Sequence, residues 1–81
     1  MRGSSHLVLI LMNDRADVDG VARLSLREMA YGTGLDPMTV IRAVKDLIAS
    51  GHIARLGQAA HHAPTSYRVL RPPRIIVHKA A

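Results

Sequence analysis

The segment LDPMTVIRAVKDL, residues 35–47, carries the side chains whose chemical use is clearest. At about 100° per residue, Met38, Arg42 and Lys45 fall on one side of a helix built from this segment. Arg42 can donate two hydrogen bonds to guanine O6 and N7, and Met38 can contact a thymine methyl group. Lys45, farther along the helix, is suited to a backbone phosphate. The types and spacing of these three residues therefore point to the groove of a DNA duplex.

The other side of the same helix is apolar, as a side that packs into a protein core must be. Val40, Val44 and Leu47 centre the apolar stripe, and three further apolar residues flank it, namely Ile41, Ala43 and Ile48. The core stripe leaves the opposite surface free for a ligand.

Both ends of this helix carry recognisable signals. Asp36 is a favourable N-cap, and Pro37 at the first helical position gives up no useful hydrogen-bond donor. Gly51 suits the left-handed conformation that commonly follows a helix. We therefore expect a helix over residues 36–50, and the amides of its first turn favour a phosphate as well.

The net charge of +5 is distributed unevenly along the chain. Residues 1–40 hold four Arg or Lys against five Asp or Glu, a net −1, whereas residues 41–81 hold seven against one, a net +6. Such an asymmetry favours a polyanionic partner, either nucleic acid or an anionic membrane surface. A membrane surface calls for one long basic amphipathic helix, but the positive charge here is spread over several elements, which favours nucleic acid.

Length and composition limit the architecture. The 81 residues suffice for a single domain over 1–81, with a core from about 5 to 70. The chain has no cysteine, so disulfides and thiolate metal sites are excluded, and its only aromatic residues are two tyrosines. We expect a thin aliphatic core that gains from a partner chain. The apolar run Leu7–Met12 is too short for a signal peptide or a membrane span, which predicts a cytoplasmic protein.

The first half of the chain predicts two helices around a short strand. Ser4 and Ser5 can cap a helix over about 6–14, and residues 21–24 favour a short strand. Ser25 to Glu28 match a capping box at the start of a second helix. Gly32 and Gly34 then offer positive φ angles for a tight turn before the third helix.

The second half predicts a β-hairpin. HIARL and YRVL alternate in polarity and flank the loop GQAAHHAPTS, which is bounded by Gly57 and Pro64. Two adjacent prolines then end the regular structure. The basic C-terminal tail, residues 71–81, contains the apolar run 75–77, for which an edge strand, a cover for the core and a contact with another protomer all remain open.

The middle of the chain resembles the winged helix-turn-helix domains of bacterial transcriptional regulators, especially the GntR-like and MarR-like groups. The matching frame is S-x-R-E-x-A, then G-L-x-x-x-T-V-x-x-A-V-x-x-L, then A-S-G-x-I, and it covers about half of the chain. It is filled by Ser25, Arg27, Glu28, Ala30, Gly34, Leu35, Thr39, Val40, Ala43, Val44, Leu47, Ala49, Ser50, Gly51 and Ile53. The resemblance implies a small α+β winged helix-turn-helix fold with three helices, a hairpin wing and a short strand before the second helix.

The resemblance also implies where DNA binds: the third helix enters the major groove, and the wing, residues 57–66, touches backbone or minor groove. The expected contacts on the helix are Pro37, Met38, Thr39, Arg42 and Lys45. Those on the wing are Gln58, His61, His62, Thr65 and Ser66, with Arg27, Arg55 and Arg68 as further candidates for backbone phosphates. GntR-like domains usually carry a polar or basic residue where Pro37 and Ile41 stand, so the base preference stays open.

Other roles for these residues remain open. Arg42 is spaced for an ion pair with Asp46, although exposed pairs in this orientation are weak. Thr39 is placed to bond within the first helical turn, and the wing is equally compatible with a solvated loop. Adjacent His61 and His62 lack a third ligand, so no metal site is expected.

The sequence favours a binding protein over an enzyme. It contains no P-loop, no HExxH motif and no nucleophile elbow, and we expect no cofactor and no small-molecule effector. The expected function is sequence-specific binding of double-stranded DNA as a small transcriptional regulator, with homodimerisation because one helix and one wing offer little area. A DNA-binding component of plasmid or phage replication, partition or excision, and a winged helix used for protein–protein contact, are the alternatives.

Overall fold

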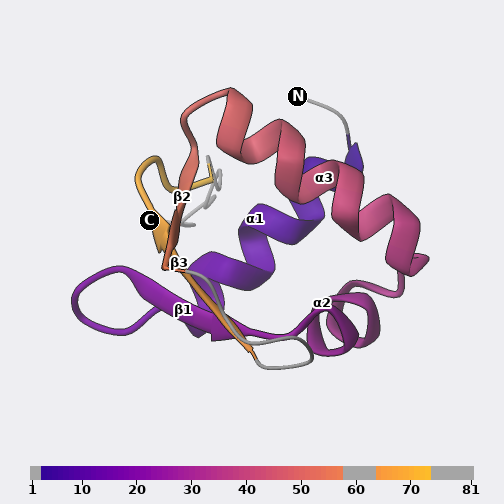
Figure 1. Ribbon diagram of the computed structural model, residues 1–81, viewed down its shortest axis with the longest axis horizontal. Coiled ribbons are helices and arrows are strands. Elements are labelled where there is room, and N and C mark those ends of the chain that lie inside the picture. The colour runs from indigo at the N-terminus through magenta and orange to yellow at the C-terminus, as the bar shows by residue number, and fades with distance from the viewer. Residues whose placement is uncertain (1–2, 58–63, 74–81) are drawn as a thin grey trace, which may run out of the picture.

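The computed structural model describes residues 3–57 and 64–73 of the chain (Figure 1). In these residues three helices and three strands follow one another in the order α1, β1, α2, α3, β2 and β3. Their bounds are α1 Gly3–Arg15, β1 Val21–Leu24, α2 Leu26–Thr33, α3 Pro37–Ala49, β2 Ile53–Leu56 and β3 Thr65–Val69. The predicted α+β class is therefore confirmed, as are the short strand before the second helix and the hairpin after the third.

The three strands form one antiparallel sheet in the order β1-β3-β2. In the register of this sheet, Tyr67 on the central strand lies opposite Ala22 of β1 and Arg55 of β2. Residues directly opposite one another in antiparallel strands point to the same face. Because Ala22 and Tyr67 are buried, this face is the inner one, and it is the face to which Arg55 belongs.

The core lies between α1, the inner face of the sheet and the two other helices, and Figure 1 shows α1 between α3 and the strands. The chain has few aromatic residues, so the core is filled by aliphatic side chains and the Tyr67 ring. The buried hydrophobic residues are Val8, Leu9, Met12, Ala22, Leu24, Met29, Val40, Ala43, Val44, Leu47, Ile53 and Tyr67. Every element contributes at least one of them.

The first helix begins earlier than the sequence predicts. Both Ser4 and Ser5 lie inside α1, so the prediction that they cap it is wrong. Ser5 lies at helical spacing from Val8, Leu9 and Met12 and shares their buried side. Its hydroxyl faces α3 and lies 3.5 Å from Asp46 Oδ2, to which it donates a long hydrogen bond. Ser5 therefore belongs to the buried side of α1 rather than to its start.

The capping box at the start of α2 is present as predicted. The Ser25 hydroxyl accepts a hydrogen bond from the Glu28 amide at 3.0 Å, and Glu28 Oε1 accepts one from the Ser25 amide at 3.1 Å. The two residues thereby satisfy two amides that a helix start otherwise leaves to solvent. This exchange fixes the point at which β1 turns into α2.

We expect Ser25→Ala to lower the free energy of unfolding by about 1 kcal/mol, because the Glu28 amide loses its acceptor. Urea denaturation followed by circular dichroism measures the effect. The control is Glu28→Gln, which keeps an acceptor oxygen within reach of the Ser25 amide and should stay close to the wild type. A Ser25→Ala variant as stable as the wild type would contradict this role of the cap.

The turn between α2 and α3 uses one of the two glycines expected to have a positive φ. Gly34 has a φ of 72° and follows the end of α2, whereas Gly32 lies within the helix, so the prediction for Gly32 is wrong. A Cβ atom on Gly32 would lie 3.0 Å from Leu11 Cδ2, which is tighter than most Cβ contacts and would push the Leu11 side chain aside. Gly32 thus serves the close approach of α2 to α1 rather than the turn.

Candidate nucleic-acid interface

The two sides of α3 divide as the sequence predicts. Val40, Ala43, Val44 and Leu47 are buried against the rest of the domain. The opposite surface consists of the exposed residues Met38, Arg42, Lys45 and Ala49, hereafter the outer stripe of α3. The Met38 side chain is 55% exposed and is not part of the buried core. The outer stripe therefore contributes none of the buried core residues.

The caps of α3 are also those expected, with one consequence for anion binding. Asp36 Oδ2 accepts hydrogen bonds from the amides of Met38 at 3.0 Å and Thr39 at 3.4 Å. This carboxylate uses two of the amides that were expected to favour a phosphate and places a negative charge beside them. The start of α3 is consequently a poor phosphate site, and positive side chains must supply the attraction.

One flank of α3 packs against α1. Asp46 is the residue spaced for an ion pair with Arg42. Its carboxylate accepts a hydrogen bond from the Ser5 hydroxyl of α1. Arg42 precedes Asp46 by four residues, one helical turn, and is exposed. By helical spacing, Arg42 therefore stands at the edge between the α1 flank and the outer stripe.

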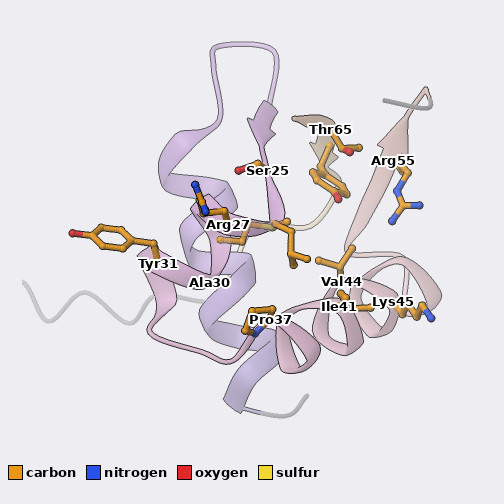
Figure 2. Close-up of a pocket in the computed structure, with 13 residues that line it drawn as sticks. Ser25, Arg27, Ala30, Tyr31, Pro37, Ile41, Val44, Lys45, Arg55 and Thr65 are labelled. Carbon is orange, nitrogen blue, oxygen red and sulfur yellow. The ribbon is translucent and has the colours of Figure 1, made fainter. Parts of the chain in front are cut away.

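The other flank of α3 borders a groove of about 1050 Å3, shown in Figure 2 and hereafter the basic groove. It lies between α2, α3 and the β2–β3 hairpin, and apolar residues make up much of its lining. The lining residues are Ser25, Leu26, Arg27, Met29, Ala30, Tyr31, Pro37, Ile41, Val44, Lys45, Arg55, Thr65 and Tyr67.

Among the described residues, three cationic side chains line the basic groove, each from a different element: Arg27 from α2, Lys45 from α3 and Arg55 from β2. The described lining contains no Asp or Glu. In Figure 2, Arg55 and Lys45 lie at the end of the groove away from Arg27. Positive charge is thus distributed along the groove without local compensation, which favours an anionic ligand that spans it.

Arg55 lies over an aromatic ring. Its Cζ atom lies 5.9 Å from the centroid of the Tyr67 ring, within the range of a cation–π interaction. Tyr67 is almost fully buried and therefore rigid. The guanidinium of Arg55 accordingly lies near a buried ring at the margin of the groove.

The register of the sheet separates Arg55 from Arg68. Arg68 lies opposite Ala54 and Val21, and its neighbour Tyr67 points to the inner face, so Arg68 belongs to the outer face of the sheet. Ser66 shares this outer face and lies opposite Arg23 of β1. Two arginines that look equivalent in the sequence therefore point to opposite sides of the hairpin.

The predicted site residues fall into several groups. The basic groove brings together Pro37, Lys45, Arg27, Arg55 and Thr65, while Met38 and Arg42 continue the surface along the outer stripe. Thr39 is half-buried, and Ser66 and Arg68 lie on the other face of the hairpin. Thr65 and Ser66 also belong to β3, so their assignment to the loop is wrong. The remaining wing candidates, Gln58, His61 and His62, lie outside the described residues.

Sequence reasoning did not assign Ser25, Tyr31 or Tyr67 to the site. Tyr31 is 91% exposed and extends away from the other labelled side chains in Figure 2. Tyr31 follows Arg27 by four residues on α2, so the sequence already placed the two side chains on the same side of this helix. The role of Tyr67 depends on the cross-strand register, which the sequence of one strand does not reveal.

In comparisons with known proteins, no family model, no curated protein and no solved structure matches this chain. Across residues 3–57 and 64–73, none of the helices is both long and apolar enough to cross a lipid bilayer. In the same residues, no three His, Asp or Glu side chains form a group that could hold a metal ion.

Proposed function

We propose that this chain is a winged helix-turn-helix domain that binds double-stranded DNA sequence-specifically, as a small transcriptional regulator. The observation that carries the proposal is the exposed outer stripe of α3, which lies beside a groove whose described lining has three cations and no acid. In this arrangement α3 enters the major groove, and the hairpin follows the sugar–phosphate backbone.

The residues divide into those that read bases and those that hold the backbone. Arg42 pairs with a guanine edge, and Met38 packs against a thymine methyl group. Lys45 belongs to both the outer stripe and the basic groove, so it lies where the backbone would leave the major groove. Arg27 and Arg55 then contact phosphates of the same strand.

The proposal includes a homodimer that acts in the cytoplasm and associates with the nucleoid. One helix and one hairpin bury less area than a specific protein–DNA interface usually needs, so two copies on a two-fold symmetric site are expected. Neither a cofactor nor a catalytic role is part of the proposal.

The salt dependence of binding tests this assignment. We expect Arg55→Gln to reduce the slope of log K against log salt concentration by about one, because one phosphate contact is lost. Fluorescence anisotropy with a labelled short duplex at several salt concentrations gives the slope.

The matched control is Arg68→Gln, which removes the same charge from the other face of the hairpin and should leave the slope unchanged. Equal losses for both variants would show that only net charge matters and would contradict the proposed docking geometry. Negligible binding of any duplex at low salt would refute the proposed function and favour a protein partner.

A further inference from the structure

The core uses only one side of α1, the side on which its four buried residues lie. At about 100° per residue, Gly3, Leu7, Ile10 and Asp14 fall in a narrow strip on the opposite side, hereafter the α1 stripe. Leu7 is 44% exposed and Ile10 is half-buried, although a surface helix normally carries polar residues on this side. We propose that two copies of the chain associate through the α1 stripe, with the two helices antiparallel. The proposal rests on the homodimer of the proposed function and deepens it by naming the surface.

The spacing of the α1 stripe is that of a helix that packs along another helix. Its four members follow one another at intervals of four, three and four residues. This is the 3.5-residue period with which a coiled-coil seam stays in line along the helix axis. The exposed surface of α1 therefore has the pattern of a short seam whose centre is apolar.

The order of residues in the α1 stripe makes it complementary to itself. The pair Leu7 and Ile10 and the pair Gly3 and Asp14 are centred on the same point of the helix. A two-fold axis at this point sets Leu7 against the partner's Ile10, and the reverse, as an isologous contact requires. The same axis sets Asp14 against the partner's Gly3. The apolar residues thus meet at the centre, and the carboxylates lie at the two ends.

The charge at the end of the α1 stripe favours the antiparallel orientation. Asp14 is exposed in the last turn of α1, where a carboxylate is unfavourable for the dipole of its own helix. In the antiparallel pair it lies at the first turn of the other helix, where a negative charge is favourable. Gly3 leaves room there, since a Cβ atom on it would have no neighbour within 4 Å. A parallel pair would instead bring two Asp14 carboxylates together.

The area of the α1 stripe indicates a weak dimer. The 13 residues of α1 span about 20 Å, so the seam is short and one helix wide. A stable interface buries about 800 Å2 on each partner, which is more than such a seam supplies. We therefore expect dimers at high protein concentration, or where a duplex with two symmetric sites holds both copies close together.

The α1 stripe is separate from the surface proposed to bind DNA. Figure 1 shows α1 with α3 on one side and the strands on the other, and the stripe lies on the side of α1 away from the core. None of its four residues belongs to the described lining of the basic groove. Association through α1 therefore leaves Arg42, Lys45 and Arg55 available for a duplex.

Disulfide cross-linking tests the register directly, because the chain has no cysteine of its own. Under mild oxidation, an equal mixture of Leu7→Cys and Ile10→Cys chains should form mixed dimers at least about tenfold faster than either variant alone, since a disulfide needs Cβ atoms about 4 Å apart. Val18→Cys, at a fully exposed loop position, gives the rate of random collision. Fastest linking of Leu7→Cys to itself, or a mixture no faster than Val18→Cys, would overturn the proposal.

Analytical ultracentrifugation tests the energetics of the same surface. Leu7→Glu should raise the dissociation constant of the dimer at least about tenfold, because a two-fold interface contains each change twice. The matched control is Leu70→Glu, at a leucine that is 51% exposed after β3, and it should leave the dimer unchanged. Asp14→Arg should weaken the dimer without destabilising the fold, since a cation suits the end of its own helix. A dimer that survives Leu7→Glu, or that Leu70→Glu dissociates instead, would contradict the α1 interface.

The outcomes distinguish this inference from the proposed function. A dimer that Leu7→Glu dissociates, in a chain that binds no duplex, would support the α1 interface and refute DNA binding. A chain that binds duplex DNA and stays monomeric at its highest soluble concentration and on a two-site duplex would overturn the α1 interface alone. Affinity that Leu7→Glu lowers for a duplex with two symmetric sites, and leaves unchanged for one site, would support both.

Discussion

Replacing Leu47 by alanine should lower the free energy of unfolding by about 2–5 kcal/mol. Leu47 is 1% exposed and stands with Val40, Ala43 and Val44 on the side of α3 that packs into the core. The truncation removes buried apolar surface and leaves a cavity in a thin core with few means of refilling it. For a domain of this size, such a loss is a large share of the total stability.

Urea denaturation of the purified chain measures this effect, and Lys45→Ala is the matched control on the same helix. Lys45 is exposed, so its replacement should change the free energy of unfolding by no more than about 0.5 kcal/mol. A Leu47→Ala variant that is as stable as Lys45→Ala would contradict the division of α3 into a core side and an outer stripe. The division matters because the core side sets the position of the side chains that face DNA.

Replacing Arg42 by alanine should weaken specific DNA binding by about 1–3 kcal/mol and relax the preference at one base position. Arg42 is exposed on the outer stripe, and Asp46, one helical turn later, accepts a hydrogen bond from Ser5. The guanidinium can therefore donate to a base edge without first breaking a buried contact. The loss should appear at every salt concentration, since a base contact is directional rather than purely electrostatic.

Titrations of a labelled specific duplex measure this effect. The single variant Lys45→Ala should also weaken DNA binding. This loss of affinity should become smaller as the salt concentration rises, as expected for a phosphate contact. Arg68→Ala, on the outer face of the sheet, should bind as the wild type does. If the Arg42→Ala, Lys45→Ala double variant keeps full affinity at low salt, the outer stripe of α3 is not the DNA-binding surface.

Much of the fold could be predicted because the signals are local. The Ser25–Glu28 capping box and the Asp36 cap with its following proline involve residues within one helical turn, and both are present. Ser5 and Gly32 were interpreted wrongly because distant elements determine their roles. Ser5 lies on the side of α1 that faces α3, and Gly32 lies where a Cβ atom would press on the Leu11 side chain of α1.

The candidate site divides in the same way. Helical periodicity alone predicts the outer stripe of α3, since core and surface positions alternate along one element. The basic groove depends on how three elements pack, and no pattern within one element reveals it. Arg55 and Arg68 illustrate the difference: both flank the hairpin loop in the sequence, and only the strand register assigns them to opposite faces.

Selection of bound duplexes from a random pool tests the central claim most directly, with the wild type, Arg42→Ala and Arg68→Ala compared side by side. The wild type should enrich one motif, repeated with two-fold symmetry if the domain binds as a dimer. Arg42→Ala should enrich the same motif with one position relaxed, and Arg68→Ala should reproduce the wild-type motif. No enriched motif, or a motif that Arg42→Ala leaves unchanged, would contradict sequence reading by α3.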